Sequence, residues 1–217
     1  MTAFAARELR AVHPWRLVRS APATATYLLV LTATTIWLTT STKREANQLL
    51  FEVSTNLHQL ARVPFRTLLG SAFWLGGWGQ LVVWAALFVA VVMPVERRLG
   101  WRRTVSAFAA GHLGASLLVA AGLWVALRID VIDRNVTRAH DVGASYGFLA
   151  VAALATYLFP QRLRVPYAVA LGALLVTFAA VDHSFTDFGH LIAASIGFAC
   201  YPLVRPSASG RTPSRPA

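Results

Sequence analysis

Two side chains in this sequence have the chemistry needed for acyl transfer: the hydroxyl of Ser145 and the imidazole of His190. A histidine that removes the proton of a serine hydroxyl turns that oxygen into a nucleophile toward a carbonyl carbon. Ser145 lies in the apolar run 141–159, and His190 lies in the apolar run 185–204. Ser145 is four residues past Asp141, and His190 is four past Thr186. If both runs are helices that enter a membrane from the same face, each residue lies about 6 Å below that point, at 1.5 Å per residue. The spacing therefore predicts that Ser145 and His190 lie at one depth, where they can hydrogen-bond if the two helices touch.

The helices that carry this dyad must touch, and both runs are rich in small residues. Glycine and alanine flank the serine and recur every four residues around the histidine: Gly143, Ala144, Gly147, Gly189, Ala193 and Gly197. Small side chains let helix backbones approach closely within a membrane. We therefore expect direct contact between the two helices.

Each of these polar residues also has a structural interpretation. A serine in a membrane helix often bonds back to a carbonyl one turn earlier, which gives Ser145 a role without chemistry. An ionisable His190 inside a membrane points more strongly to a cavity or a polar partner. His112, nearer the other membrane face, is interpreted as a structural hydrogen-bonding residue. Asp141 and Asp187 are interpreted as helix caps, and Asp187, three residues before His190, is also a candidate to influence that histidine.

The composition identifies an integral membrane protein. The 217 residues are 56% hydrophobic and only 13% charged, whereas about a quarter of the residues in soluble domains are charged. The net charge of +11 comes from cations that fall between apolar runs, where they set topology. We therefore expect the lipid bilayer, and no nucleic acid, as a partner. Cys200 is the only cysteine, so an internal disulfide is excluded.

The apolar runs predict an all-α, polytopic membrane protein with a six-helix bundle. Each run is near the roughly 20 residues that a helix needs to cross the hydrocarbon core. The predicted spans are at about 23–42, 69–95, 105–127, 141–159, 165–181 and 185–204. Residues 43–68 form a polar loop whose leucines and valines share one helical face, which is typical of a helix in the membrane interface. Residues 1–22 are an N-terminal segment, and residues 205–217 are a tail expected to be disordered.

The positive charges predict the orientation and the location. Thirteen of the 20 cations fall in the termini and connections on one side, and seven fall on the other. Because cytoplasmic segments are enriched in arginine and lysine, both termini are predicted to be cytoplasmic. Lys43 is the only lysine among many arginines, alanines and valines, which indicates a bacterial chain in the cytoplasmic (inner) membrane.

Short motifs between residues 62 and 203 resemble the rhomboid family, whose members are six-span intramembrane serine proteases with a Ser–His dyad between the fourth and sixth spans. Residues 143–145 resemble the start of the G-x-S-G motif, and residues 189–191 resemble the sixth-span A-H-x motif. Further matches are the entry into the second span (65–69, Phe73 and 76–78) and a charged turn (95–100). The resemblance implies an intramembrane serine endopeptidase without a cofactor, with Ser145 as nucleophile and His190 as base.

The same comparison of motifs shows two departures at the site. Tyr146 stands where active rhomboids have glycine, and it is expected to point away from the dyad because it lies about 100° further round the helix. The family's second-span H-x-x-x-N pair corresponds to Gln80 and Trp84. Gln80 can donate through its amide, whereas Trp84 has only an indole N–H. The resemblance implies that Gln80, Gly143 and backbone N–H groups near the serine support the oxyanion.

Two other functions stay open. A catalytically inactive rhomboid pseudoprotease would bind transmembrane clients without cutting them, and the altered oxyanion positions favour this hypothesis. A metal-dependent membrane hydrolase would use polar residues at the outer ends of the last three spans: His140, Asp141, His183, Asp187 and His190. No short metal-binding signature such as H-E-x-x-H supports the hydrolase.

Overall fold

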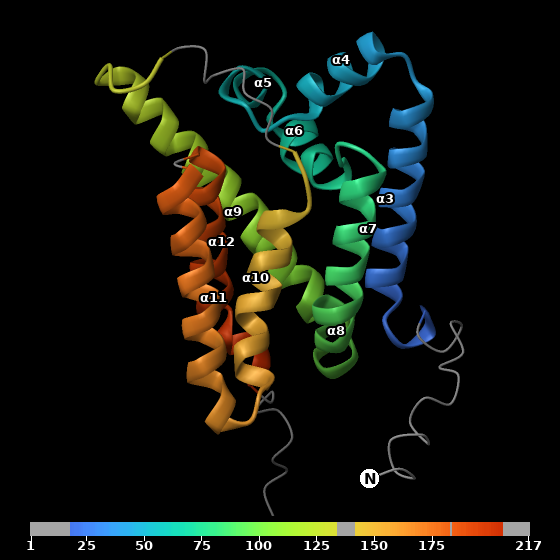
Figure 1. Cartoon of the computed structure of the whole chain (residues 1–217), viewed down its shortest axis with the longest axis vertical. Coiled ribbons are helices and arrows are strands. Elements are labelled where there is room, and N and C mark those ends of the chain that lie inside the picture. The colour runs from blue at the N-terminus through green and yellow to red at the C-terminus, as the bar shows by residue number, and fades with distance from the viewer. Residues whose placement is uncertain (1–17, 134–141, 183, 206–217) are drawn as a thin grey trace, which may run out of the picture.

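The computed structural model describes residues 18–133, 142–182 and 184–205, and this part of the chain is helical without a β-strand (Figure 1). The all-α prediction is therefore confirmed for the described residues. The helices are α3 (Pro22–Thr40), α4 (Lys43–Val53), α5 (Leu57–Arg62), α6 (Pro64–Gly70), α7 (Trp78–Leu87), α8 (Met93–Leu99), α9 (Trp101–Arg128), α10 (Ser145–Ala155), α11 (Gln161–Asp182) and α12 (Phe185–Ala199). A π-helical turn, η2 (Phe88–Val92), joins α7 to α8, and 3₁₀ turns follow α6, α10 and α12: η1 (Ser71–Phe73), η4 (Thr156–Leu158) and η5 (Tyr201–Val204).

Within the described residues, four segments are long and apolar enough to cross a membrane: Pro22–Thr40, Trp78–Leu99, Trp101–Arg128 and Gln161–Val181. The apolar segment Ser145–Leu158 and the 15-residue α12 are shorter. The chain is therefore a multi-pass membrane protein in contact with the lipid bilayer. The count of six spans stays a prediction, because these two helices fall below the roughly 20 residues of a full crossing.

The second apolar run is divided, where one span at 69–95 was expected. Its first residues form the end of α6 and the turn η1, and the crossing helix begins only at Trp78. Gly77 precedes that helix with a φ of 147°, a backbone conformation that favours glycine and interrupts the helix. Residues 64–73 consequently lie together with α4 and α5 at the upper end of the bundle in Figure 1.

The amphipathic segment 43–68 is likewise divided into helices by its caps. Thr42 caps α4 in a reciprocal arrangement with Glu45, and the side chain of Asn56 accepts from the N–H of Gln59 at 2.9 Å to begin α5. Polar caps of this kind satisfy the first N–H groups of a helix, which have no partner inside it. The chain therefore turns between Val53 and Leu57 rather than continuing as one interfacial helix.

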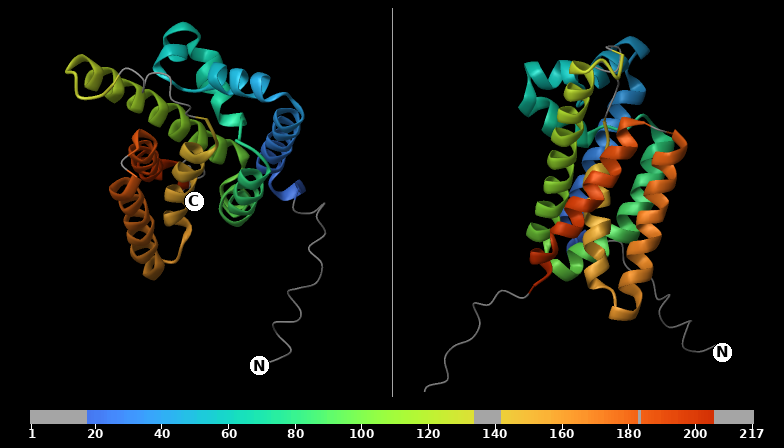
Figure 2. Two further views of the ribbon diagram at one scale, coloured as in Figure 1. Left: turned by 45° about the horizontal axis from the view of Figure 1, so that its top comes forward. Right: turned by 90° about the vertical axis from the view of Figure 1, so that its left-hand side faces the viewer.

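Helix α10 lies at the centre of the bundle, between α9 and α12 on one side and α7 on the other (Figure 2). Every residue from Tyr146 to Ala155 is buried. The ring centroid of Phe148 lies 5.4 Å from that of Trp84 and 5.7 Å from that of Phe88. The start of α10, where the predicted nucleophile lies, is therefore held by helices on several sides.

Helix α3 is joined to α8 by hydrogen bonds at its own first turn. Ala21 at the N-cap has no side chain that could cap the helix. Instead Glu96, only 2% exposed, accepts from the N–H groups of Ala23 and Thr24 at 2.8 and 2.7 Å and from the Thr24 hydroxyl at 2.6 Å. A carboxyl group at this position satisfies donors that the helix leaves unpaired and complements the helix dipole. Glu96 therefore fixes where α3 starts against α8.

We predict that Glu96→Ala destabilises the protein by about 3 kcal/mol, because two N–H groups and a hydroxyl then lose their acceptor in a buried place. Thermal unfolding in detergent micelles measures the effect. The matched control is Glu52→Ala, which removes a 3.4 Å ion pair to Arg66 from a side chain that is 36% exposed, and which should cost about 0–1 kcal/mol. Equal losses for the two variants would contradict the capping role of Glu96.

Candidate functional site

Ser145 is the first residue of α10, and it is half-buried within the bundle. The chain reaches it through Gly143, whose φ of 132° suits glycine and whose N–H donates to the Ser71 carbonyl at 2.8 Å. Ala144 follows as the N-cap and makes no side-chain hydrogen bond to the first turn. Backbone N–H groups in the first turn of a helix lack intrahelical partners and favour anions. Ser145 therefore stands beside groups that can stabilise a negative charge.

His190 lies on α12, one turn below the helix start, beside a fixed carboxyl group. Asp187 is held by the N-cap Ser184: its N–H donates to the Ser184 hydroxyl oxygen at 3.2 Å, and that hydroxyl donates to Asp187 Oδ2. Asp187 Oδ1 lies 3.6 Å from His190 Nδ1. The other ring nitrogen, Nε2, is buried and has no hydrogen-bond partner in the described part of the chain. Asp187 thus orients the imidazole from the first turn of α12. The N-cap of this helix is Ser184, and not Asp187 as predicted.

Tyr146 lies against this imidazole. The rings of Tyr146 and His190 meet edge to face, with centroids 5.5 Å apart and planes at 73°. Between the described residues Ser145 and His190 there is no hydrogen bond, since Nε2 is unpaired and Nδ1 faces the carboxyl group. The expectation that Tyr146 points away from the dyad is wrong.

The rotation of α10 explains why Tyr146 takes this place. Residues four apart share a face of a helix, and Tyr146 and Ala150 lie on the face of α10 that meets α9 and α12. The Tyr146 ring lies over Gly189 of α12, whereas the Ala150 carbonyl lies against Gly197 of α12 and its Cβ faces Gly111 of α9. Ser145 shares its side of the helix with Phe148, whose ring packs on α7. Ser145 therefore lies on the side of α10 next to the one that carries Tyr146.

Close contact between α10 and α12, which the small residues predicted, is confirmed. Gly189, Ala193 and Gly197 are all buried. A Cβ at Gly189 would lie 2.3 Å from the Tyr146 hydroxyl oxygen, and a Cβ at Gly197 would lie 2.2 Å from the Ala150 carbonyl oxygen. Any larger side chain at these positions would push the two helices apart or displace the tyrosine ring.

The side chain of Gln80 is engaged at the beginning of α7. It is exposed, and its Oε1 accepts from the N–H of Gly76 at 2.8 Å. Trp84, one turn on, packs edge to face on Phe148 in the core. The described contacts therefore give Gln80 a local role around Gly77, the N-cap of α7, and they give Trp84 a packing role.

His112 is closer to the site than its position in the sequence indicates. Its Nε2 lies 2.9 Å from the Leu68 carbonyl oxygen and 3.1 Å from Ser71 Oγ. A carbonyl oxygen only accepts, so Nε2 is the protonated ring nitrogen. Because the Ser71 carbonyl in turn accepts from Gly143, this buried histidine ties α9 to the segment that enters α10. The structural role predicted for His112 fits these bonds, and the partner that sequence reasoning missed is Ser71.

Three of the residues proposed for a metal site, His140, Asp141 and His183, lie outside the described residues. Within the described ranges, no group of three or more His, Cys, Asp or Glu side chains is arranged to hold a metal ion.

A family model described as "Rhomboid-like protein" matches residues 16–210 of the chain. No curated protein and no solved structure matches the chain. The matched region contains all of the helices described above, including both residues of the proposed dyad.

We predict that Gly189→Ala destabilises the protein by about 1–3 kcal/mol through overpacking against Tyr146. In a Tyr146→Ala background the same change should cost much less, with a coupling of about 0.5–3 kcal/mol in a double-mutant cycle. Thermal unfolding of the four proteins measures this coupling. Gly172→Ala is the control, because a Cβ there meets nothing within 4 Å and α11 should be unchanged or gain up to about 1 kcal/mol. Additive effects of the two site changes would contradict the tyrosine contact.

Proposed function

The chain belongs to the rhomboid-like protein family, and from this premise we propose that it is a pseudoprotease that binds single-span membrane clients without cleaving them. The observation that carries the proposal is the edge-to-face contact of Tyr146 with His190. A general base must come within about 2.6–3.2 Å of the hydroxyl that it deprotonates. With the tyrosine ring against the imidazole, Ser145 lacks the hydrogen bond that would activate it.

The oxyanion positions support the same proposal. Gln80, the residue expected to donate to the oxyanion, is exposed and bonded through Oε1 to Gly76. Loss of one oxyanion donor typically costs about 2.7–4 kcal/mol, or roughly 10²–10³ in rate. This bond occupies the acceptor oxygen of Gln80 and holds the side chain at the exposed start of α7, so the donors beside the serine are the N–H groups at the start of α10, next to Gly143. A site with an inactive serine and reduced oxyanion support favours binding over cleavage.

The surface proposed for a client is formed by α7 and α11, which lie on opposite sides of α10 in the left-hand view of Figure 2. Val83 on α7 is 57% exposed, and Val169 and Val176 on α11 are 63% and 56% exposed. Apolar side chains on these helices contact lipid when no client is bound, so a client helix can replace lipid without uncovering polar groups. Helix–helix association in a membrane relies on such packing.

An intramembrane serine endopeptidase is the second candidate, and one observation favours it. His190 Nε2 is buried without a partner in the described chain, while Asp187 faces Nδ1. Buried polar groups normally have partners, and a base that is oriented on one side and open on the other is the arrangement that proton transfer needs. If the Tyr146 ring moved aside, Nε2 could take the proton of Ser145 as its oxygen attacks a peptide carbonyl, with the oxyanion held at the start of α10.

We predict that the protein in liposomes captures a tagged single-span reporter and leaves it intact. A photo-crosslinking amino acid at Val83 should capture the reporter, whereas one at Leu29, which is 70% exposed on α3, should capture little. Ser145→Ala should leave capture unchanged, because client binding does not require the serine nucleophile. Electrophoresis of the tagged reporter measures both capture and cleavage.

A fluorophosphonate probe separates the two candidates. The pseudoprotease should show no labelling at Ser145 in a folded sample. Cleavage of the reporter, with labelling that is lost in Ser145→Ala and His190→Ala and slowed in Gln80→Ala, would establish the protease instead. Equal capture at Val83 and Leu29 would contradict the client surface.

We also propose that both termini face the cytoplasm of a bacterial inner membrane. The described arginines near one end of the bundle support this orientation, since the α8–α9 turn and the start of α11 carry Arg97, Arg98, Arg102, Arg103, Arg162 and Arg164. In a Cys200→Ala background, a membrane-impermeant thiol reagent outside cells should label Ile129→Cys and spare Leu163→Cys; both positions are exposed. The reverse pattern would invert the topology.

A further inference from the structure

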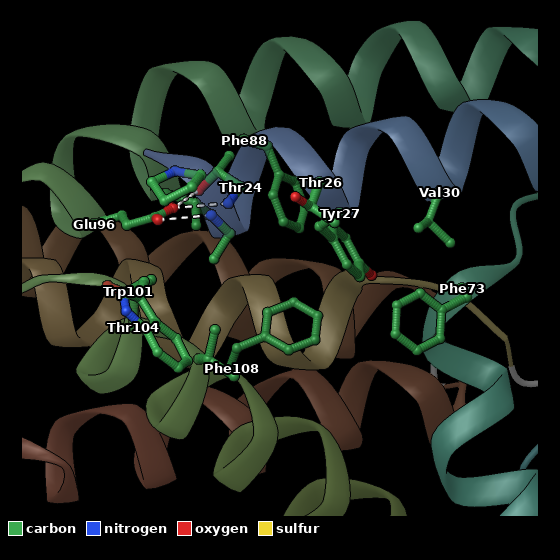
Figure 3. Close-up of a pocket in the computed structure, with 14 residues that line it drawn as sticks. Thr24, Thr26, Tyr27, Val30, Phe73, Phe88, Glu96, Trp101, Thr104 and Phe108 are labelled. Atoms are coloured by element: carbon green, nitrogen blue, oxygen red, sulfur yellow. Dashed lines mark hydrogen bonds between the residues drawn. The ribbon is translucent and has the colours of Figure 1, made fainter. Parts of the chain in front are cut away.

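A groove between α3 and α9 lies apart from the proposed site (Figure 3). Its volume is about 510 Å³. Phe88 and Val92, on the turn between α7 and α8, form a buried floor, whereas Thr26 on α3 and Trp101 on α9 lie at an exposed rim. The groove runs along α3 from Trp101 to Phe73 (Figure 3). It therefore opens sideways from the bundle, where lipid surrounds a membrane protein.

The polar atoms that line this groove are mostly bonded to the protein itself. Glu96 accepts from the first turn of α3, including the hydroxyl of Thr24. The hydroxyls of Tyr27 and Thr104 donate to backbone carbonyls at 2.5 and 3.1 Å. The remaining lining is aliphatic and aromatic apart from Thr26 at the rim. An occupant must therefore be apolar over most of its length.

The size of the groove selects a slender occupant. The volume of the groove lies in the range of about 300–1,000 Å³ that is common for small-ligand sites. A membrane-crossing helix about 30 Å long and 10 Å wide would need roughly 2,000 Å³, so a client helix does not fit between α3 and α9. A single hydrocarbon chain has both the shape and the polarity that the groove requires.

The charge at one end of the groove indicates the headgroup. Trp101, which is 51% exposed, forms that end, and the guanidinium carbon of the exposed Arg102 lies 5.4 Å from the centre of its ring. Tryptophan and arginine side by side are typical of the headgroup level, where each cation attracts anionic lipid. Arg98 is directed elsewhere, since it donates to the Leu158 carbonyl at 3.0 Å. Among the described residues that line the groove, the carboxyl group is that of Glu96, which is already engaged by α3.

We propose that the groove binds one acyl chain of an anionic phospholipid, with the phosphate against Arg102. This binding site is independent of the proposed client surface and of the dyad. The lipid fills the space between α3 and α9 and so holds α3 to the rest of the bundle, in addition to the bonds that α3 makes to Glu96.

The test uses the full chain in detergent with a phosphatidylglycerol whose acyl chain carries a photoreactive group. Mass spectrometry of the crosslinked peptides should place the label on α3 and α9 within the groove. Unlabelled phosphatidylglycerol should compete more strongly than phosphatidylcholine. Arg102→Gln should reduce that preference about fivefold, which corresponds to about 1 kcal/mol for one cation near anionic lipid, and Arg162→Gln, an exposed arginine at the start of α11, should not.

A second pair of variants tests the groove itself. Thr26→Phe fills the rim and should abolish the groove crosslinks, whereas Leu29→Phe, on the same helix but outside the groove, should preserve them. Unchanged thermal unfolding without lipid shows that both variants are folded. Crosslinks spread equally over α11, equal effects of Arg102→Gln and Arg162→Gln, or displacement of the lipid by a single-span peptide would each overturn the proposal.

Discussion

The position of α10 depends on glycines that let three helix backbones meet at Ala150. A Cβ at Gly111 on α9 would lie 2.1 Å from the Ala150 Cβ, and a Cβ at Gly197 on α12 would lie 2.2 Å from its carbonyl oxygen. Within a membrane the hydrophobic effect does not drive helices together, so close packing of this kind has to hold them. The crossing at Ala150 fixes both the depth and the rotation of α10. That rotation then decides which residue at its first turn faces α12.

The residue that faces α12 is Tyr146, and the character of the site follows from it. Because Gly189 has no side chain, the tyrosine ring fits over α12 and reaches His190. Asp187 holds the far side of the imidazole, so the histidine is oriented although its serine partner is not bonded to it. A client-binding protein that keeps the residues of a dyad without joining them is consistent with this packing. The buried, unpartnered Nε2 is the feature that keeps a protease in consideration.

Much of the fold was predictable from the sequence, because hydropathy and small-residue spacing report directly on membrane helices and their contacts. The contact of α10 with α12 came from the spacing of Gly189, Ala193 and Gly197. The rotation of α10 could not be predicted, since it depends on Gly111 in a third helix. The late start of α7 was also missed, because apolar residues continue through Gly77 and only its backbone conformation breaks the helix. The link from His112 to Gly143 required Ser71, whose role no local pattern reveals.

The central claim is that Tyr146 takes the place beside His190 that an active serine would need. An experimental structure of the protein in lipid nanodiscs, resolved well enough to show side chains, tests this most directly through the distance from Ser145 Oγ to His190 Nε2. We predict a distance beyond hydrogen-bond range, with the Tyr146 ring edge to face with the imidazole. A distance of about 2.6–3.2 Å, with the tyrosine ring turned away from His190, would contradict the account.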